Sequence, residues 1–145
     1  MKIRLIDNKE DISQFEKLRS ESFGLDYSIS KYYYEKFKQK TLLIIGAYEN
    51  DELIGCVYVS PFFTTRGYID ELFVREDYRN SELHVGTTLL RYVENNIESI
   101  SEYFQFCLST LLIEYCDKRS ETLYLKEGYK PTAIDGTLYK KVNKQ

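Results

Sequence analysis

The N-terminal part of the chain has the hydrophobic pattern of a strand followed by helices. Polar and apolar residues alternate over residues 2–6, as they do in a half-buried strand. Asp7 and Asn8 then provide caps for a helix that should end near Gly24. Apolar side chains recur on one face of that helix at Ile12, Phe15 and Leu18. A second helix is expected over residues 30–39.

The middle of the chain has the pattern of antiparallel strands. Residues 41–48 (TLLIIGAY) and 53–59 (LIGCVYV) are strongly apolar, and the polar turn ENDE separates them, which predicts a hairpin. Residues 68–74 (YIDELFV) are short, rich in strand-forming residues and almost continuously apolar, apart from Asp70 and Glu71. Three consecutive strands are therefore expected before the next helix.

The C-terminal half is expected to contain two helices and three strands. From Gly86 onwards, apolar residues at three- and four-residue spacing predict one helix of about four turns. These apolar residues are Leu89, Val93, Ile97 and Ile100. Residues 106–109 predict a strand and residues 111–127 a further helix. The turn dipeptide Asp135–Gly136 indicates a final hairpin.

This order of elements defines the fold class that we expect. Hairpins are mixed with strand–helix–strand crossovers, whereas a doubly wound parallel sheet contains crossovers without hairpins. The sequence therefore predicts an α/β (α+β) fold with a mixed, mostly antiparallel central sheet flanked by helices. Because no repeat or linker divides the chain, residues 1–145 are expected to form a single domain.

Composition excludes several classes of protein. With 43% hydrophobic and 30% charged residues the chain looks globular, and no apolar run is long enough to cross a bilayer. Its N-terminus lacks the apolar core of a signal peptide, so we expect a cytoplasmic location. The net charge of −3 gives no general attraction for nucleic acid. Three cysteines without CxxC spacing argue against disulfides or a metal site, and the single histidine argues against a Ser/His/Asp triad.

One stretch, residues 68–91, has the pattern of an anion-binding site. It reads as a buried strand, a polar turn containing Gly86, and the first turns of an amphipathic helix. The unpaired N–H groups at a helix start and the positive end of the helix dipole both favour a negative charge. We therefore expect an anion to bind at this turn.

The same stretch resembles a known family. The segments IDELFVREDYR and GTTLL, and the later TLYLKEGYK, are similar to motifs of the GNAT superfamily of acyl-CoA-dependent N-acetyltransferases, over essentially the whole chain. The resemblance implies acetyl-CoA as the acyl donor and no metal ion. It implies that strand backbone beside a splay in the sheet pairs with the pantetheine arm, while the loop and helix start hold the pyrophosphate. The implied cofactor-binding residues are Phe73, Val74, Arg79, Val85, Gly86, Thr87 and Thr88.

The loop before the helix departs from the family pattern. Counted back from the helix, Gly86 matches the second glycine of the motif, and His84 stands where the first is expected. Arg79 lies two residues further away than usual. A residue other than glycine costs roughly 1 kcal/mol in a left-handed conformation. We expect the extra residues to form a bulge that leaves the N–H donors of residues 85–88 available to the cofactor.

The resemblance also implies how the transfer is catalysed. Glu71 matches the acid that serves as the base in the family, and Tyr124 matches the tyrosine that protonates the departing thiolate. Asp70 is the alternative base, and adjacent residues on a regular strand point to opposite faces. Either acid could instead pair with a basic side chain, and Tyr124 could instead belong to the core.

The acceptor is less defined by the sequence. The resemblance places the acceptor wall near Asp26, Tyr27, Tyr33 and Tyr34, and carboxylates with aromatic faces suit a cationic amine. A small-molecule primary amine is the first expectation, and a peptide or protein amine is the second. A GNAT-like module that binds a ligand or partner without turnover is the alternative from another class. A homodimer is left open as the assembly.

Overall fold

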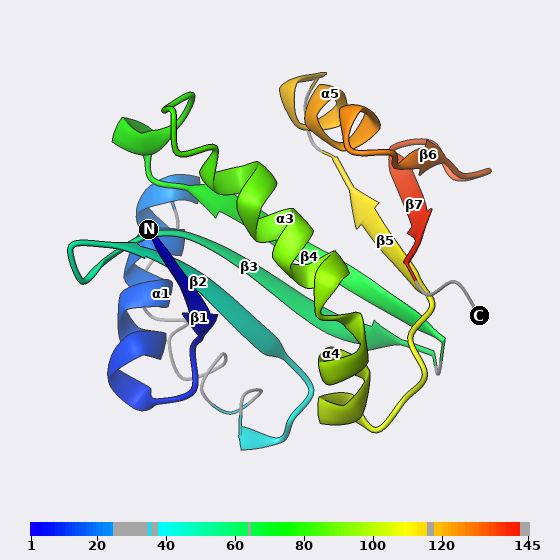
Figure 1. Cartoon of the computed structure of the whole chain (residues 1–145), viewed down its shortest axis with the longest axis horizontal. Helices are drawn as coiled ribbons and strands as arrows, with labels where there is room; N and C mark the ends of the chain where they lie inside the picture. The colour runs from blue at the N-terminus through cyan, green and yellow to red at the C-terminus, as the bar shows by residue number, and fades with distance from the viewer. Residues whose placement is uncertain (25–34, 36–37, 64, 116–117, 143–145) are drawn as a thin grey trace.

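The computed structural model describes residues 1–24, 35, 38–63, 65–115 and 118–142, the side chain of residue 23 excepted, and contains one seven-stranded sheet in this part of the chain (Figure 1). The strands are β1 (Lys2–Leu5), β2 (Leu43–Glu49), β3 (Glu52–Phe62), β4 (Arg66–Val74), β5 (Thr110–Glu114), β6 (Lys130–Pro131) and β7 (Thr137–Lys141). Their order is β1-β2-β3-β4-β5-β7-β6, and the neighbours are antiparallel except β4 and β5. The predicted mixed, mostly antiparallel sheet is confirmed.

Helices cover both faces of the sheet (Figure 1). They are α1 (Lys9–Phe23), α3 (Val85–Asn95), α4 (Ile97–Phe104) and α5 (Lys118–Lys126), with a short 3-10 turn η2 (Glu76–Tyr78). One core cluster lies between α1 and the sheet, where Ile12 and Phe15 are fully buried. The other lies on the face of α3 and α4 and includes residues of β5 and α5. In the described part of the chain, no helix is long and apolar enough to span a membrane.

Both ends of α1 and the turn between β2 and β3 lie where the sequence predicts them. The Asn8 side chain accepts a hydrogen bond from the Asp11 N–H, and Gly24 ends α1 in the left-handed conformation at φ 65°. The β2–β3 turn places Asn50 at φ 52° and Asp51 at φ 64°. Two left-handed residues make the turn type that matches the twist of an antiparallel pair.

The predicted helix from Gly86 is interrupted. Asn96 separates α3 from α4 at φ −114°, and its side-chain Nδ2 donates to the Tyr92 carbonyl over 2.8 Å. An asparagine side chain can compete in this way with the backbone bonds of a helix. All four apolar positions predicted for this helix are buried, Leu89, Val93, Ile97 and Ile100. The pattern therefore predicted the buried face correctly and missed the break.

Two elements of the C-terminal half were predicted at the wrong positions. The strand expected at residues 106–109 lies at β5, and the helix expected from residue 111 begins at Lys118. Leu111 and Ile113 are buried while Leu112 between them is only half-buried, which is the alternation of a strand. The apolar run LLI is too short for its periodicity to separate a strand from a helix. The helix predicted over residues 30–39 falls largely outside the described residues.

Candidate active site

The sheet opens between β4 and β5. Their parallel pairing runs from Arg66 opposite Thr110 to Ile69 opposite Ile113 and ends there, although β4 continues to Val74 beside β3. Pairing with β5 therefore covers only the first part of β4. This is the splay in the sheet that the resemblance implied.

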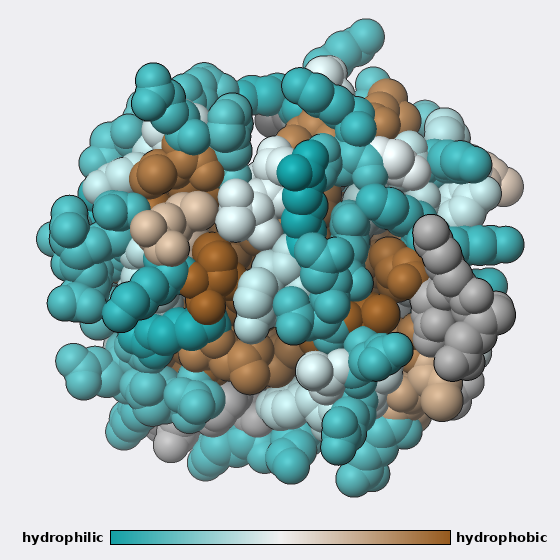
Figure 2. Space-filling model, viewed as in Figure 1, coloured by the Kyte–Doolittle hydropathy of each residue, from teal (hydrophilic) through white to brown (hydrophobic). Residues whose placement is uncertain are grey.

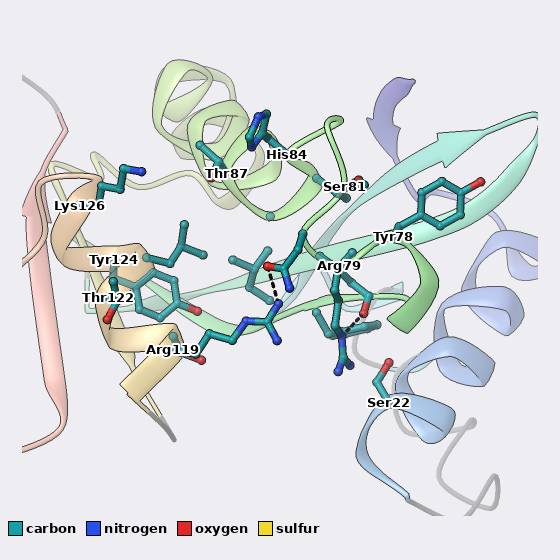
Figure 3. Close-up of a pocket in the computed structure, with 18 residues that line it drawn as sticks. Ser22, Tyr78, Arg79, Ser81, His84, Thr87, Arg119, Thr122, Tyr124 and Lys126 are labelled. Atoms are coloured by element: carbon teal, nitrogen blue, oxygen red, sulfur yellow. Dashed lines mark hydrogen bonds between the residues drawn. The ribbon is translucent and has the colours of Figure 1, made fainter.

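A cavity of about 630 Å³ lies at this opening (Figure 3). It is walled by the end of β4, the loop after it, the first turn of α3 and one face of α5. In the space-filling view the surface is hollowed between the segments that form α3 and α5 in Figure 1 (Figure 2). Most predicted cofactor-binding residues line the cavity, namely Phe73, Val74, Arg79, Val85, Gly86 and Thr87. Thr88 does not line it, and both its N–H and its hydroxyl donate to the His84 carbonyl.

The cavity lining is positively charged although the protein is acidic. Arg79, Arg119 and Lys126 line it, and among the described residues its lining includes no aspartate or glutamate. The first turn of α3 also carries no acid, so nothing there opposes the positive end of the helix dipole. The lining therefore favours an anionic ligand, although the whole chain carries a net charge of −3.

The lengthened loop leaves the helix start open. His84 takes the left-handed conformation, at φ 49° and ψ 51°, at the position where the motif has glycine. The first bond of α3 runs from the Thr88 N–H to the His84 carbonyl over 2.9 Å. The preceding N–H groups, at residues 85–87, therefore have no partner within the helix. Of the donors expected to be available, those of residues 85–87 therefore are, whereas the Thr88 N–H is used by the helix itself.

Two glycines set the space around this helix start. A Cβ on Gly55 of β3 would come within 2.8 Å of Val85 and 3.2 Å of the Phe73 carbonyl, so Gly55 allows α3 to approach the sheet. A Cβ on Gly86 would meet Leu123 and Val74 at no less than 3.7 Å. Protein packing therefore does not require a glycine at 86, and its open face adjoins the cavity, where an anion can approach the backbone.

Arg79 is fixed at the mouth of the cavity by the strand that precedes it. Its Nε donates to the Val74 carbonyl over 2.9 Å, at the last residue of β4. Arginine has five N–H donors, so this bond leaves most of the guanidinium available to a ligand. Neither Arg119, which also lines the cavity, nor the role of Gly55 was predicted from the sequence.

The two candidate bases lie on the same side of the sheet, contrary to the alternation expected for adjacent residues. In β4, Glu71 pairs with Tyr58 and Ile69 pairs with Val59, so Asp70 is an extra residue in a β-bulge. The Asp70 carboxylate accepts a bond of 2.6 Å from Ser60, which lies two residues after Tyr58 and hence on its face. Both acids therefore face the side that α1 covers.

Their partners differ. Arg19 of α1 donates two hydrogen bonds to the Glu71 carboxylate, from Nε to Oε2 over 2.8 Å and from Nη2 to Oε1 over 2.6 Å. Asp70 makes its bond to Ser60 from a half-buried position, and partial burial raises its pKa to about 6, with a further increase from the charge of Glu71. Neither acid lines the cavity, but Asp70 directly follows the last residue of β4 that pairs with β5.

Tyr124 joins the cavity from α5. Its side chain is 5% exposed, packs against the Tyr129 ring at 6.1 Å, and points towards the cavity in Figure 3. The structure thus combines the two readings of Tyr124, a core residue and a cavity residue. The predicted acceptor residues Asp26, Tyr27, Tyr33 and Tyr34 lie outside the described residues.

Comparison with known proteins identifies the family. The sequence profile described as the acetyltransferase (GNAT) family matches residues 12–129. An aminoglycoside 6′-N-acetyltransferase solved with coenzyme A has a TM-score of 0.78 and 17% identity, covering 100% of this chain and 99% of its own. PaiA N-acetyltransferase from Thermoplasma acidophilum, also with coenzyme A, has a TM-score of 0.65 and 18% identity, covering 97% and 99%.

A third similar structure is the ribosomal-protein-alanine N-acetyltransferase from Brucella melitensis, with a TM-score of 0.75 and 15% identity over 97% of this chain and 99% of that one. No curated protein sequence matches the chain. At these identities the similar structures establish the fold, and the profile establishes the family. The cation-lined cavity, the open helix start and the parted strands fit coenzyme A as well. The chain therefore belongs to the GNAT family of acetyltransferases, enzymes that take their acetyl group from acetyl-CoA.

Proposed function

We propose that the protein acetylates a primary amine of a small molecule by direct attack of the amine on the thioester. The observation that carries this proposal is the placement of Asp70 at the point where β4 and β5 part, on the side opposite the cation-lined α3 face. A donor held in the opening and an acceptor arriving from the α1 side would meet beside this carboxylate.

We assign the base to Asp70 and give Glu71 a supporting role. An alkylammonium with a pKa of about 10.4 must lose a proton before it attacks, which costs roughly 4–5 kcal/mol at neutral pH. A base is most effective when its pKa lies near the working pH, and the pKa of Asp70 is raised to about 6. Glu71 is held by Arg19 in a bidentate ion pair. Its lone pairs are therefore less available to a substrate proton.

Tyr124 completes the proton balance. Acetyl-CoA supplies an activated acyl group, and the amine nitrogen forms the new C–N bond as the C–S bond breaks. Asp70 takes the proton that the ammonium loses before the attack, directly or through water, and releases it to solvent. The nitrogen loses a second proton as the amide forms, and the Tyr124 hydroxyl, which gives its proton to the departing sulfur, regains one through water. Tyr124 is suited to this role because it lines the cavity while its ring is fixed against Tyr129.

The described residues on the acceptor side suit a cation. Tyr68 lies two positions before Asp70, and its pKa is raised by burial and by a hydrogen bond to Glu114, with a further contribution from the charge of Asp70. The phenol thus lies near two carboxylates, and acids beside an aromatic ring favour an ammonium group. Phe62 is exposed and lies against the Tyr68 ring, and the exposed Phe63 lies against Phe62.

Support for a small-molecule acceptor comes from the aminoglycoside 6′-N-acetyltransferase, whose name states its substrate class. The ribosomal-protein-alanine enzyme has the same fold, so the fold alone does not separate the two acceptor classes.

The test is a thiol-release assay with acetyl-CoA and two panels, small primary amines and peptides with free N-termini. Release of coenzyme A with small amines, above the rate of hydrolysis, is the expected result. Release only with the peptides would replace the small-molecule acceptor by a protein one. No release with either panel would contradict the proposed transfer.

A further inference from the structure

A hydrogen bond crosses the cavity between two elements that are distant in sequence. Nη2 of Arg119, in the first turn of α5, donates to Oδ1 of Asn80 in the loop before α3 over 2.8 Å. Both residues line the cavity, and Figure 3 shows the bond between its two walls. The guanidinium of Arg119 is thereby held over the cavity instead of being left to move in solvent.

Arg119 occupies a place where a cation does not help its own helix. α5 begins with Lys118 and Arg119, at the end where the helix dipole is positive and disfavours cations. The acid of this turn, Glu121, forms a hydrogen bond with Tyr115. Among the described residues Arg119 has no carboxylate partner. A cation that is disfavoured by its helix and faces a ligand cavity is more consistent with ligand binding than with helix stability.

Asn80 belongs to the part of the loop that is longer than the family pattern. It adopts the left-handed conformation at φ 59°, which asparagine tolerates better than most residues. The same conformation turns its amide towards Arg119. The lengthened loop therefore supplies a contact across the cavity in addition to leaving the helix start open.

We propose that Arg119, oriented by Asn80, binds a phosphate group of acetyl-CoA on the wall opposite Arg79. Asn80 takes one of the five N–H donors of Arg119, and the others can form charge-assisted bonds to phosphate oxygens. Arg79, on the wall formed by the end of β4 and the loop after it, is held by its bond to the Val74 carbonyl. The cofactor phosphates would then lie between two oriented guanidinium groups, beside the N–H groups of α3. This inference concerns donor binding alone and is independent of the acceptor and of Asp70.

The test measures acetyl-CoA binding by titration calorimetry without any acceptor. Arg119→Gln should weaken binding about tenfold or more, since bonds between charged groups contribute at this level. Asn80→Gly removes the orienting amide while keeping a residue that accepts positive φ, and it should weaken binding less. In the double variant the loss should equal that of Arg119→Gln alone, because Asn80 acts through Arg119.

The matched control is Arg66→Gln, an exposed residue at the opposite end of β4 that changes the net charge equally. It should leave the affinity within about twofold, because long-range charge effects are screened. An equal loss in Arg66→Gln and Arg119→Gln would overturn the proposal, as would an unchanged affinity in Arg119→Gln. Failure of the wild-type protein to bind acetyl-CoA would overturn it too.

Two truncated donors identify the phosphate. If Arg119 contacts the 3′-phosphate, Arg119→Gln should weaken binding of acetyl-CoA and leave 3′-dephospho-acetyl-CoA unaffected. If it contacts the pyrophosphate, both should weaken equally. S-acetylpantetheine lacks these groups, so an equal loss for that donor would contradict a phosphate contact. Because no acceptor is present, these results do not depend on whether the proposed amine transfer is observed.

Discussion

At the scale of single residues, the site depends on two adjacent carboxylates that have different hydrogen-bond partners. Asp70 and Glu71 share one side of the sheet because of the bulge in β4. Arg19 neutralises Glu71 through two hydrogen bonds, whereas Asp70 is left with the hydroxyl of Ser60. One acid therefore stabilises the contact between α1 and β4, and the other keeps a raised affinity for a proton.

Substitution of the two acids should produce opposite results. Asp70→Asn should lower kcat by about 10²- to 10⁴-fold, the usual contribution of a general base, without loss of folding stability. Glu71→Gln should destabilise the fold by about 1–3 kcal/mol, because Arg19 loses a charged partner in a mostly buried position. Steady-state kinetics and urea unfolding measure the two effects. A full kcat in Asp70→Asn would remove Asp70 from the mechanism.

The raised pKa of Asp70 predicts two pH dependences. Activity should fall as the pH falls through about 6, where the carboxylate becomes protonated. Stability should change in the other direction. The folded state binds this proton more tightly than the unfolded state, so its stabilising effect is complete below pH 3.8 and is lost as the pH rises through about 6.

A shift of that size corresponds to roughly 3 kcal/mol. Asp70→Asn should therefore raise the melting temperature at pH 8 and change it little at pH 4. Thermal unfolding at the two values checks this, and equal shifts at both would show that the effect is not caused by ionisation.

Tyr124 should be separable into its two roles. Tyr124→Phe keeps the ring that packs against Tyr129 and removes the hydroxyl. We expect kcat to fall by about 10²-fold, with the dissociation constant of acetyl-CoA nearly unchanged. Calorimetry and steady-state kinetics on the same preparation give both quantities. A parallel loss of binding and stability would indicate that Tyr124 serves the core alone.

At the scale of elements, the start of α3 is assembled by residues that do not lie on it. Gly55 lets the helix approach β3, and His84 supplies the left-handed turn that begins it. The motif predicted where the strained residue lies. It could not predict that the loop reaches α5 through Asn80, because this contact depends on a residue 39 positions away.

His84→Gly should relieve the strain in this turn. The left-handed conformation costs a non-glycine residue about 1–2 kcal/mol, and part of the gain is offset by the greater freedom of glycine in the unfolded chain. We therefore expect the free energy of unfolding to rise by about 0.5–1 kcal/mol. Chemical denaturation measures it, with His84→Ala as the matched control, which should give no increase. A destabilised His84→Gly would mean that the imidazole itself holds the loop.

Other elements show where periodicity stops being informative. The hairpin of β2 and β3 and the caps of α1 were predictable because each depends on nearby residues, such as Asn8 and Gly24. The bulge at Asp70 and the position of β5 depend on which strand lies beside which. A single sequence does not contain that information in its local pattern.

At the scale of the molecule, the protein consists of two parts that meet at the opening. β4 and β5 share only the pairs from Arg66 with Thr110 to Ile69 with Ile113. Side chains of α3 reinforce the junction with the C-terminal part. Arg91 binds Glu127 over 2.6 Å, which lowers the pKa of that carboxylate, and Glu94 accepts bonds from Lys140 and Tyr129. The fold class could be predicted from element order, but this division into two parts could not.

The short junction between β4 and β5 has a consequence for local opening of the native state. Sub-global fluctuations follow the boundaries where the fewest bonds must break. Amides of β5 and β7 should therefore exchange with solvent faster than those of β2 and β3. Acetyl-CoA bound between the end of β4 and α5 would contact both parts and should slow exchange in β5 and β7 selectively. Hydrogen–deuterium exchange with and without acetyl-CoA measures this difference, and uniform protection of all strands would contradict it.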